Sequence, residues 1–430
     1  MRPCKNGSPM SFESAIYKRT VFPNGLKVIT EAIPHVRSVS LGLWLDVGSR
    51  DESDAEAGMS HFIEHMVFKG TKNRSAREIA SYLESVGGVV NAFTSREQTC
   101  LYAKFLDQHL GKAIELLFDI LNNSLFDKVE IEKEKKVILE EIKDVDDSPG
   151  DLVHDRFVRV FFGNHPLGRS ILGSRTTVKN MVRPKMMRYL ARLYRPDKTI
   201  IAASGNLDHA QLVELVANEF DAKIFKKSLN GRKKPNYKTQ RRVFKHKSTQ
   251  THVCLGIPAR DFNDPSRTAT ILLNSMMGGG MSSRFFQQLR EHLGIVYNVF
   301  SYLDYFEDSS VLGIYFGTDK RNVKKAMTAV VNEIERLKSE KLTKDEIDKI
   351  KEQLKGNLML GLENTSSRMN RLAKHEILTG RYISLDETIA AIDSVHPDEI
   401  TELARELFDR DRITAVSLGP VTDGIFSALD

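Results

Sequence analysis

The feature that most constrains the fold is a pattern that occurs twice, 213 residues apart. LAR (190–192) is followed by LYRPDKTIIAASGN, and LAR (403–405) is followed by ELFDRDRITAVSLG. In both copies the end of a helix leads through a charged turn into a strand rich in β-branched residues. The stretches LFDKVEIEKEKKVILEEI (125–142) and LTKDEIDKIKEQLKGNLML (342–360) also resemble each other. A repeat of about 210 residues that occurs twice indicates duplicated domains rather than a solenoid.

Each half begins with strands and continues with helices. In the first half, Asn24-Gly25 separates two alternating runs in RTVFPNGLKVITEAI, which is typical of a hairpin turn. The stretch VSLGLWLDVGSR corresponds in the second half to THVCLGIPAR. This order predicts an α+β fold of two homologous domains, each a mostly antiparallel sheet with helices packed on one face.

The positive charge of the chain is concentrated in one segment. Between Lys226 and Lys247 there are ten Lys or Arg residues and no acid, whereas the whole chain has a net charge of +6, so the remainder carries −4. A nucleic-acid patch would have this composition, but Gly231, Pro235 and the weak periodicity favour a solvated linker without a nucleic-acid partner. The expected units are a first domain, a basic linker and a second domain: residues 1–225, 226–248 and 249–430.

The stretch MSHFIEHMVFKG places titratable groups in an otherwise apolar helix. His61, Glu64 and His65 stand at i, i+3 and i+4, so they share one helical face. Two imidazoles one turn apart can hold a divalent metal such as zinc, and a glutamate beside them can take a proton from water. A pair of structural histidines near a helix end is the alternative. A catalytic zinc also needs a third protein ligand.

His-x-x-Glu-His is the inverted zincin motif, and the chain resembles the pitrilysin-type metallopeptidases, the family of insulin-degrading enzyme and the mitochondrial processing peptidase. The resemblance implies one zinc ion per chain, held by His61, His65 and a glutamate on another helix. The family spacing places that ligand at Glu141 in KKVILEEIKD, with Glu140 as its competitor. Glu134, two helical turns before Glu141, resembles the family carboxylate that orients a metal-bound histidine.

Two further stretches carry the resemblance. GGVVNAFTSREQTCLY resembles the edge strand that holds substrate in the family, with Asn91, Ala92 and Thr94 in the substrate-binding positions. In the second half, which lacks the metal motif, Arg290 and Tyr297 of LREHLGIVY resemble a pair that contacts the bound peptide. There, Tyr297 could donate a hydrogen bond to the developing oxyanion and Arg290 could hold a substrate carbonyl.

The resemblance implies a zinc-dependent endopeptidase that cleaves extended peptides or unstructured segments, with Glu64 as the general base. Two alternatives stay open: a non-catalytic core-type structural subunit, and a processing-peptidase subunit that needs a different partner chain. Long family members carry four such domains and this chain carries two. It therefore resembles the short members, which implies a homodimer with composite sites.

Neither a membrane span nor a secretory signal is apparent in the sequence, because no apolar run approaches about 18 residues. We expect no membrane partner and a location in the bacterial cytoplasm, with the mitochondrial matrix left open.

Overall fold

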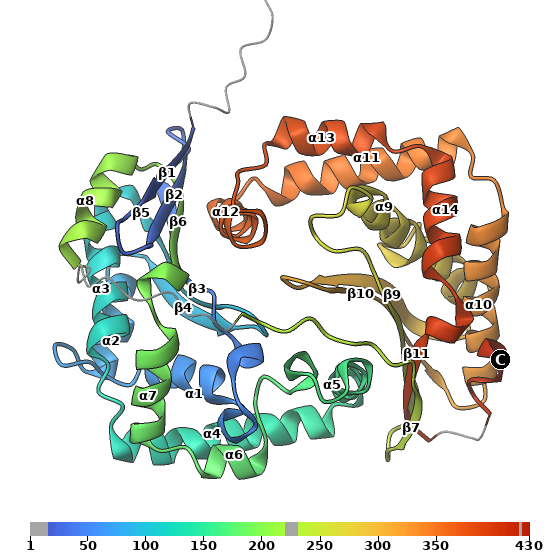
Figure 1. Cartoon of the computed structure of the whole chain (residues 1–430), viewed down its shortest axis with the longest axis horizontal. Coiled ribbons are helices and arrows are strands. Elements are labelled where there is room, and N and C mark those ends of the chain that lie inside the picture. Colours follow the sequence, from blue (N-terminus) through green and yellow to red (C-terminus); the bar gives the residue numbers. More distant parts are fainter. Residues whose placement is uncertain (1–15, 220–230, 421–423) are drawn as a thin grey trace, which may run out of the picture.

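The computed structural model describes residues 16–219, 231–420 and 424–430. Each half of the chain builds one sheet, and the two halves lie side by side (Figure 1). In the described part of the chain, no helix is long and apolar enough to cross a membrane.

The sheet of the first half has the strand order β1-β2-β6-β3-β5-β4. Neighbours are antiparallel except β2 and β6, which are parallel. The predicted hairpin turn is present between β1 and β2, where Gly25 has a φ of 90° and Leu26 N–H donates to Asn24 Oδ1. The strands are β1 (Tyr17–Val21), β2 (Lys27–Ala32), β3 (Ser38–Leu45), β4 (Val89–Thr94), β5 (Thr99–Leu106) and β6 (Thr199–Gly205).

The sheet of the second half has the order β7-β11-β8-β10-β9. Again one neighbouring pair, β7 and β11, is parallel and the others are antiparallel. The order therefore repeats β2-β6-β3-β5-β4 strand for strand, which supports a duplicated domain. The strands are β7 (Arg241–Lys245), β8 (Gln250–Pro258), β9 (Val296–Tyr305), β10 (Ser310–Asp319) and β11 (Thr414–Gly419).

Helices of each half pack on one face of its own sheet and enclose a large apolar core. In the first half this core contains Phe62, Leu117 and Tyr189, and in the second Leu273, Phe316 and Val330. The helices of the first half are α1 (Met59–Met66), α2 (Ala76–Glu84), α3 (Leu110–Asn123), α4 (Lys128–Asp147), α5 (Pro149–Phe162), α6 (Arg175–Lys179), α7 (Arg183–Leu193) and α8 (His209–Glu219). Those of the second are α9 (Arg267–Gly278), a π-helix (Phe286–His292), α10 (Val323–Ser339), α11 (Lys344–Gly361), α12 (Thr365–Thr379), α13 (Leu385–Ser394) and α14 (Pro397–Leu407).

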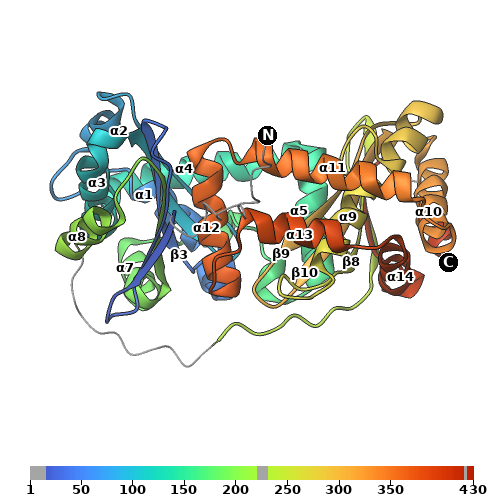
Figure 2. The ribbon, with the colours of Figure 1, turned by 90° about the horizontal axis from the view of Figure 1, so that it is seen from above.

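Two helices are exchanged between the halves. Helix α5 of the first half packs on β8 and β11 of the second sheet, where Phe157 is buried beside Cys254 and Val416. Helix α12 of the second half packs on β2, β3 and β6 of the first sheet, where Met369 lies in one cluster with Trp44. The α+β class with two homologous domains is thus confirmed, but each sheet also has its second face covered by a helix from the other half (Figures 1 and 2).

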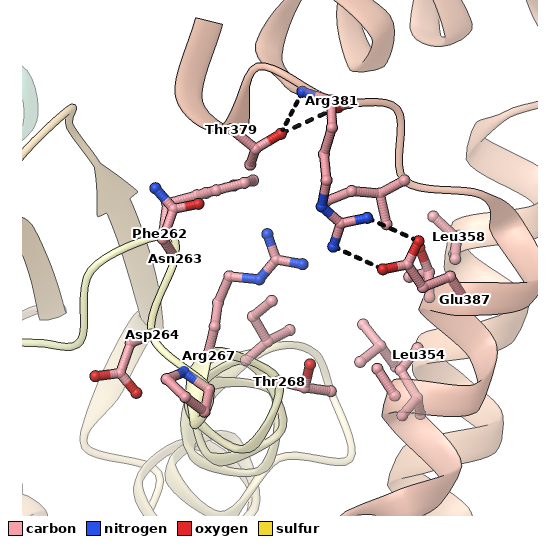
Figure 3. A pocket seen from close by; sticks show the side chains of 16 residues that line it. Phe262, Asn263, Asp264, Arg267, Thr268, Leu354, Leu358, Thr379, Arg381 and Glu387 are labelled. Atoms are coloured by element: carbon pink, nitrogen blue, oxygen red, sulfur yellow. Dashed lines mark hydrogen bonds and ion pairs between the residues drawn. The ribbon is translucent and has the colours of Figure 1, made fainter. Parts of the chain in front are cut away.

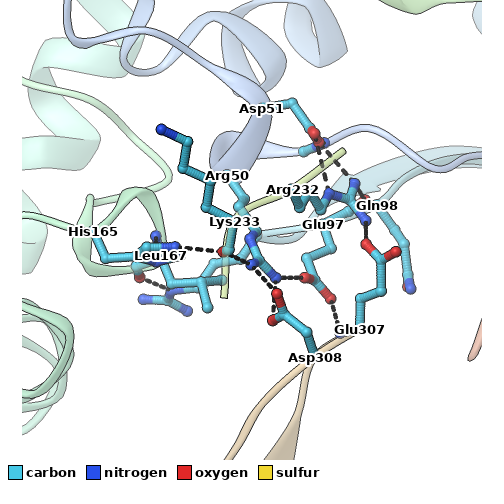
Figure 4. Close-up of polar contacts among 12 residues, drawn as sticks. Arg50, Asp51, Glu97, Gln98, His165, Leu167, Arg232, Lys233, Glu307 and Asp308 are labelled. Atoms are coloured by element: carbon cyan, nitrogen blue, oxygen red, sulfur yellow. Dashed lines mark hydrogen bonds and ion pairs between the residues drawn. The ribbon is translucent and has the colours of Figure 1, made fainter. Parts of the chain in front are cut away.

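The basic segment between the halves differs from the predicted solvated linker. Its last part, Arg241–Lys245, forms β7 and pairs in parallel with β11, so it belongs to the second sheet. Arg232 is nearly buried and forms ion pairs with Asp46, Asp51 and Glu307 (Figure 4). Part of the positive charge therefore neutralises acids at the domain junction. The predicted boundary at residue 225 lies outside the described residues.

A second arginine connects the tips of two hairpins at the same junction. Arg50 lies 2.5 Å from Glu97 of the β4–β5 turn and 2.7 Å from Asp308 of the β9–β10 turn. It also donates to the carbonyl of Lys233 (Figure 4). The Arg50 side chain is only 1% exposed, and removal of one partner from such a buried ion pair is strongly destabilising. This contact fixes how the edges of the two sheets face each other.

Candidate metal centre

Helix α1 positions the titratable groups of the HFIEH motif. Its start is stabilised by Glu52, whose carboxylate accepts hydrogen bonds from the N–H groups of Gly58 and Ser60. Phe62 and Ile63 are buried in the core of the first half. The apolar residues thereby fix the rotation of the helix, and the other face carries His61, Glu64 and His65.

The motif meets Glu141 of helix α4. His61 Nε2 lies 3.7 Å from Glu141 Oε2, and His65 Nε2 lies 3.5 Å from Glu141 Oε1. One ligand atom from each residue lies within 4.8 Å of the other two. Zinc bonds of about 2.0–2.1 Å in tetrahedral geometry separate ligand atoms by about 3.4 Å. The three side chains therefore fit a zinc ion with little rearrangement.

Glu134 lies on the far side of His65. Its Oε2 is 3.0 Å from His65 Nδ1, and its Oε1 is 2.7 Å from Lys69 Nζ. A proton held on Nδ1 by this carboxylate leaves the Nε2 lone pair free for a metal. Lys69 follows His65 by four residues, so helical spacing alone could have identified it, although the sequence analysis did not.

Glu140, the competitor of Glu141, faces away from this group. Its side chain is 70% exposed and lies 3.5 Å from Lys143 Nζ. Adjacent helical residues point about 100° apart, so only Glu141 of these two glutamates reaches the histidines.

The electrostatic environment favours metal binding. Burial, together with the nearby His65, lowers the pKa of His61 to about 4, so its imidazole is neutral at neutral pH. Burial raises the pKa of Glu64, although Thr94 and His65 oppose the shift. Glu64 Oε2 and Glu141 Oε2 are among the buried side-chain atoms that have no hydrogen-bond partner in the described part of the chain. Such atoms are costly unless satisfied, and a cation with an accompanying water would satisfy both.

Strand β4 lies beside this group at the edge of its sheet. In the part of the chain that the structure describes, it pairs with β5 alone, with Asn91 opposite Tyr102 and Thr94 opposite Thr99, and it also packs against α1. Asn91 is exposed and Ala92 is buried. The other edge of β4 can accept an extended peptide through main-chain hydrogen bonds.

Arg290 and Tyr297 lie in the second half. The Arg290 guanidinium lies 5.3 Å from the centre of the Tyr297 ring and 4.8 Å from that of Phe286. Tyr297 is 74% exposed. Within residues 16–219 and 231–420, neither side chain forms a hydrogen bond or ion pair with the metal-ligand set. The structure thus brings the two residues together, on a surface of the other domain.

Fold and site together define a class: duplicated α+β proteins with an inverted zincin helix beside an edge strand. The pattern of "Insulinase (Peptidase family M16)" matches residues 27–175, and that of "Peptidase M16 inactive domain" matches residues 180–354. The chain belongs to peptidase family M16, as a pitrilysin-type member with two domains.

The sequences of relatives agree with this assignment, and solved structures share the fold. The chain is 40% identical to the uncharacterized zinc protease YmxG of Bacillus subtilis over 93% of this chain and 97% of the relative. It is 39% identical to an uncharacterized zinc protease of Streptomyces coelicolor over 94% of this chain and 90% of the relative. The fold is similar to that of a Helicobacter pylori protease, with a TM-score of 0.87, 24% identity and coverage of 94% and 99%. It is also similar to a chain of Complex III2 from Candida albicans, with a TM-score of 0.82, 21% identity and coverage of 96% and 97%.

Proposed function

We propose that the protein is a zinc-dependent endopeptidase that cleaves extended peptides or unstructured segments. The observation that carries this proposal is the convergence of His61, His65 and Glu141, with Glu64 on the same helix face and the edge of β4 alongside. When bound, zinc supplies Lewis acidity toward the peptide carbonyl and the attacking water. One ion per chain is sufficient for this site.

The residues of the chain would bind the substrate and transfer the proton. Strand β4 binds the substrate backbone in an extended form, which excludes folded domains and tolerates many side chains. Glu64 takes a proton from the attacking water and passes it to the leaving amine. Burial raises the pKa of Glu64 and so brings its basicity closer to that needed at neutral pH.

We further propose that the active form is a homodimer with composite sites. Tyr297 is 74% exposed, next to Arg290, and both lie in the half without the metal motif. A second chain can present this pair to a peptide bound beside α1, with Tyr297 donating to the oxyanion and Arg290 holding a carbonyl. Two-fold symmetry forms both sites at once.

A complementation experiment tests both parts of the proposal. An inactive Glu64→Gln chain is mixed with an inactive Tyr297→Phe chain under conditions that exchange subunits, as verified by mass spectrometry. One site of each mixed dimer then has an intact Glu64 and an intact Tyr297. Cleavage of a quenched peptide should return to about half of the wild-type rate per mixed dimer if the sites are independent. Exchange without recovery, with both variants folded and zinc-loaded, contradicts the composite site.

The other roles in this family differ in measurable ways. A core-type structural subunit would not cleave peptides even when zinc-loaded, and a processing-peptidase subunit would cleave only after a different chain is added. Elemental analysis followed by a peptide-library assay of the chain alone separates these cases. The bacterial relatives support a bacterial cytoplasmic location for the proposed enzyme.

A further inference from the structure

A cavity of about 350 Å³ lies in the second half, between helices α9 and α11. These helices occupy the chain positions that α1 and α4 have in the first half, where the metal donors meet. The cavity is completed by the loop before α9, the connection between α12 and α13, and α13 itself (Figure 3). Its volume is in the range of small-molecule sites.

Arg267, the first residue of α9, projects into this cavity (Figure 3). Its guanidinium lies 4.2 Å from the centre of the Phe262 ring. Among the residues that the structure describes, the Arg267 side chain forms no hydrogen bond or ion pair, and burial lowers its pKa. Half-buried guanidinium groups normally have hydrogen-bond acceptors. The arginine is therefore available to bind an anion.

In the described part of the chain, no neighbouring acid forms an ion pair with the Arg267 side chain. Glu387 is occupied by Arg381, with two hydrogen bonds of 2.7 and 3.0 Å. Asp264 accepts hydrogen bonds from the N–H and hydroxyl of Ser266 and points away from the Arg267 guanidinium (Figure 3). The positive charges of Arg381 and Arg371 also lower the pKa of Arg267, whereas Tyr305 and Glu387 raise it. The lining as a whole carries no net charge, since Arg267 and Arg381 stand against Asp264 and Glu387, but no acid that the structure describes is hydrogen-bonded to Arg267.

The opposite side of the cavity is aliphatic. It is formed by Leu354 and Leu358 of α11, Ile271 of α9, and Ile383 and Ile392 from the segments beyond α12. A site with one unpaired cation opposite an aliphatic wall matches a ligand with one negative group and an apolar body.

We propose that this cavity binds a carboxylate carried by a short aliphatic group. The carboxylate would pair with Arg267, whose planar guanidinium suits bidentate recognition. The aliphatic part would pack on Leu354, Leu358 and Ile271. A free alkyl carboxylic acid and the C-terminal residue of a peptide share this chemistry. The site is separate from the metal centre and does not depend on the proposed peptidase activity.

Titration calorimetry of the zinc-loaded full chain tests the proposal with octanoate and its neutral analogue octanamide. We expect saturable binding of octanoate and at least about tenfold weaker binding of octanamide, because the charge-assisted hydrogen bonds are lost. Affinity should also rise from butanoate to octanoate, by at most about fourfold per methylene. Equal binding of octanoate and octanamide overturns the proposal.

An Arg267→Gln variant locates the site. It should bind octanoate at least about tenfold more weakly, whereas Arg321→Gln, which removes an exposed arginine paired with Asp319, should bind like the wild type. Unchanged binding by folded Arg267→Gln would show that the carboxylate binds elsewhere, for example at zinc, and would overturn the proposal. If Arg267→Gln does not fold, the comparison of octanoate with octanamide is repeated on the wild type after removal of zinc; a retained preference for octanoate supports the proposal, and a preference that is lost with the metal overturns it.

Competition experiments separate the two ligand sources. N-acetyl-leucine displaces octanoate if a peptide C-terminus fits the site, and N-acetyl-leucinamide serves as the neutral control. Displacement by the acid alone supports a peptide terminus, and binding of octanoate without displacement supports a free alkyl acid. Equal displacement by acid and amide contradicts the role of the carboxylate.

Discussion

Helices α1 and α9 follow corresponding strands, β3 and β8, in two sheets with the same strand order, and both pack beside the edge strand of their sheet. Helix α1 carries two histidines and a glutamate on one face, whereas α9, with the sequence RTATILLNSMMG, has no histidine or acid. Helix α4 supplies Glu141 to the first site, and α11 supplies leucines to the second cavity.

The two domains share a fold that determines where a site can form, and a few side chains determine the chemistry of each site. The first domain brings imidazoles and carboxylates together, which suits a metal. The second presents the Arg267 guanidinium in its cavity, without an ion pair in the described part of the chain, and an exposed Arg290–Tyr297 pair at the start of its edge strand β9. This division of chemistry between the domains can be tested by substitutions at Glu64, Tyr297, Glu141 and Glu134.

Glu64→Gln should lose the most activity. The amide keeps the shape of the side chain but cannot accept the proton of the attacking water, so the rate of peptide cleavage should fall by about 10²- to 10⁴-fold. Zinc content by elemental analysis should remain that of the wild type, because Glu64 is not a ligand. Glu140→Gln, on the exposed side of α4, is the matched control. A near wild-type rate in Glu64→Gln would show that Glu64 is not the general base.

Tyr297→Phe should reduce kcat by about 10²- to 10³-fold, the effect of removing one oxyanion donor. Zinc content should not change, since Tyr297 lies in the other domain and is exposed. Both kcat and zinc content should be measured on the same preparation of Tyr297→Phe. Loss of zinc together with activity would mean that the second domain contributes to the metal site, and the division drawn here would be wrong.

Substitution of a residue that only supports a metal ligand typically weakens metal binding by about 10- to 100-fold. Glu141→Gln should weaken zinc binding by more than this, because it changes a ligand. Glu140→Gln should retain zinc, since its side chain is 70% exposed and points away from the histidines. Competition with a chelator gives the two affinities. Equal affinities would show that Glu141 is not the third ligand.

Glu134→Gln should have the smallest effect, about 10- to 100-fold in zinc affinity. The neutral amide no longer holds a proton on His65 Nδ1 as strongly and loses the ion pair with Lys69. Glu132→Gln is the control, because Glu132 is exposed and pairs only with Lys135. The same chelator assay applies, and an unchanged affinity would leave Glu134 with a structural role alone.

Some features of the fold and site followed from local pattern. The doubled sequence pattern predicted two homologous α+β domains, and the Asn24-Gly25 turn was placed correctly. Helical spacing put His61, Glu64 and His65 on one face. These features are local because hydrogen bonds and side-chain periodicity within a few residues determine them.

Local sequence patterns were thus enough to predict the duplication, the order of strands and helices, and the metal motif, but the packing partners of each element depend on the folded chain. An amphipathic pattern requires that one face of α5 or α12 be buried, but it does not specify which sheet covers it. The same holds for charge: Arg232 lies in a stretch with the composition of a solvated linker, yet it is buried against Asp46 and Asp51. The sequence does not distinguish Arg267 from the other arginines, whereas the fold places its side chain in a cavity where, among the described residues, no acid is hydrogen-bonded to it. Contacts between residues hundreds of positions apart depend on how whole elements pack, and no local pattern contains that information.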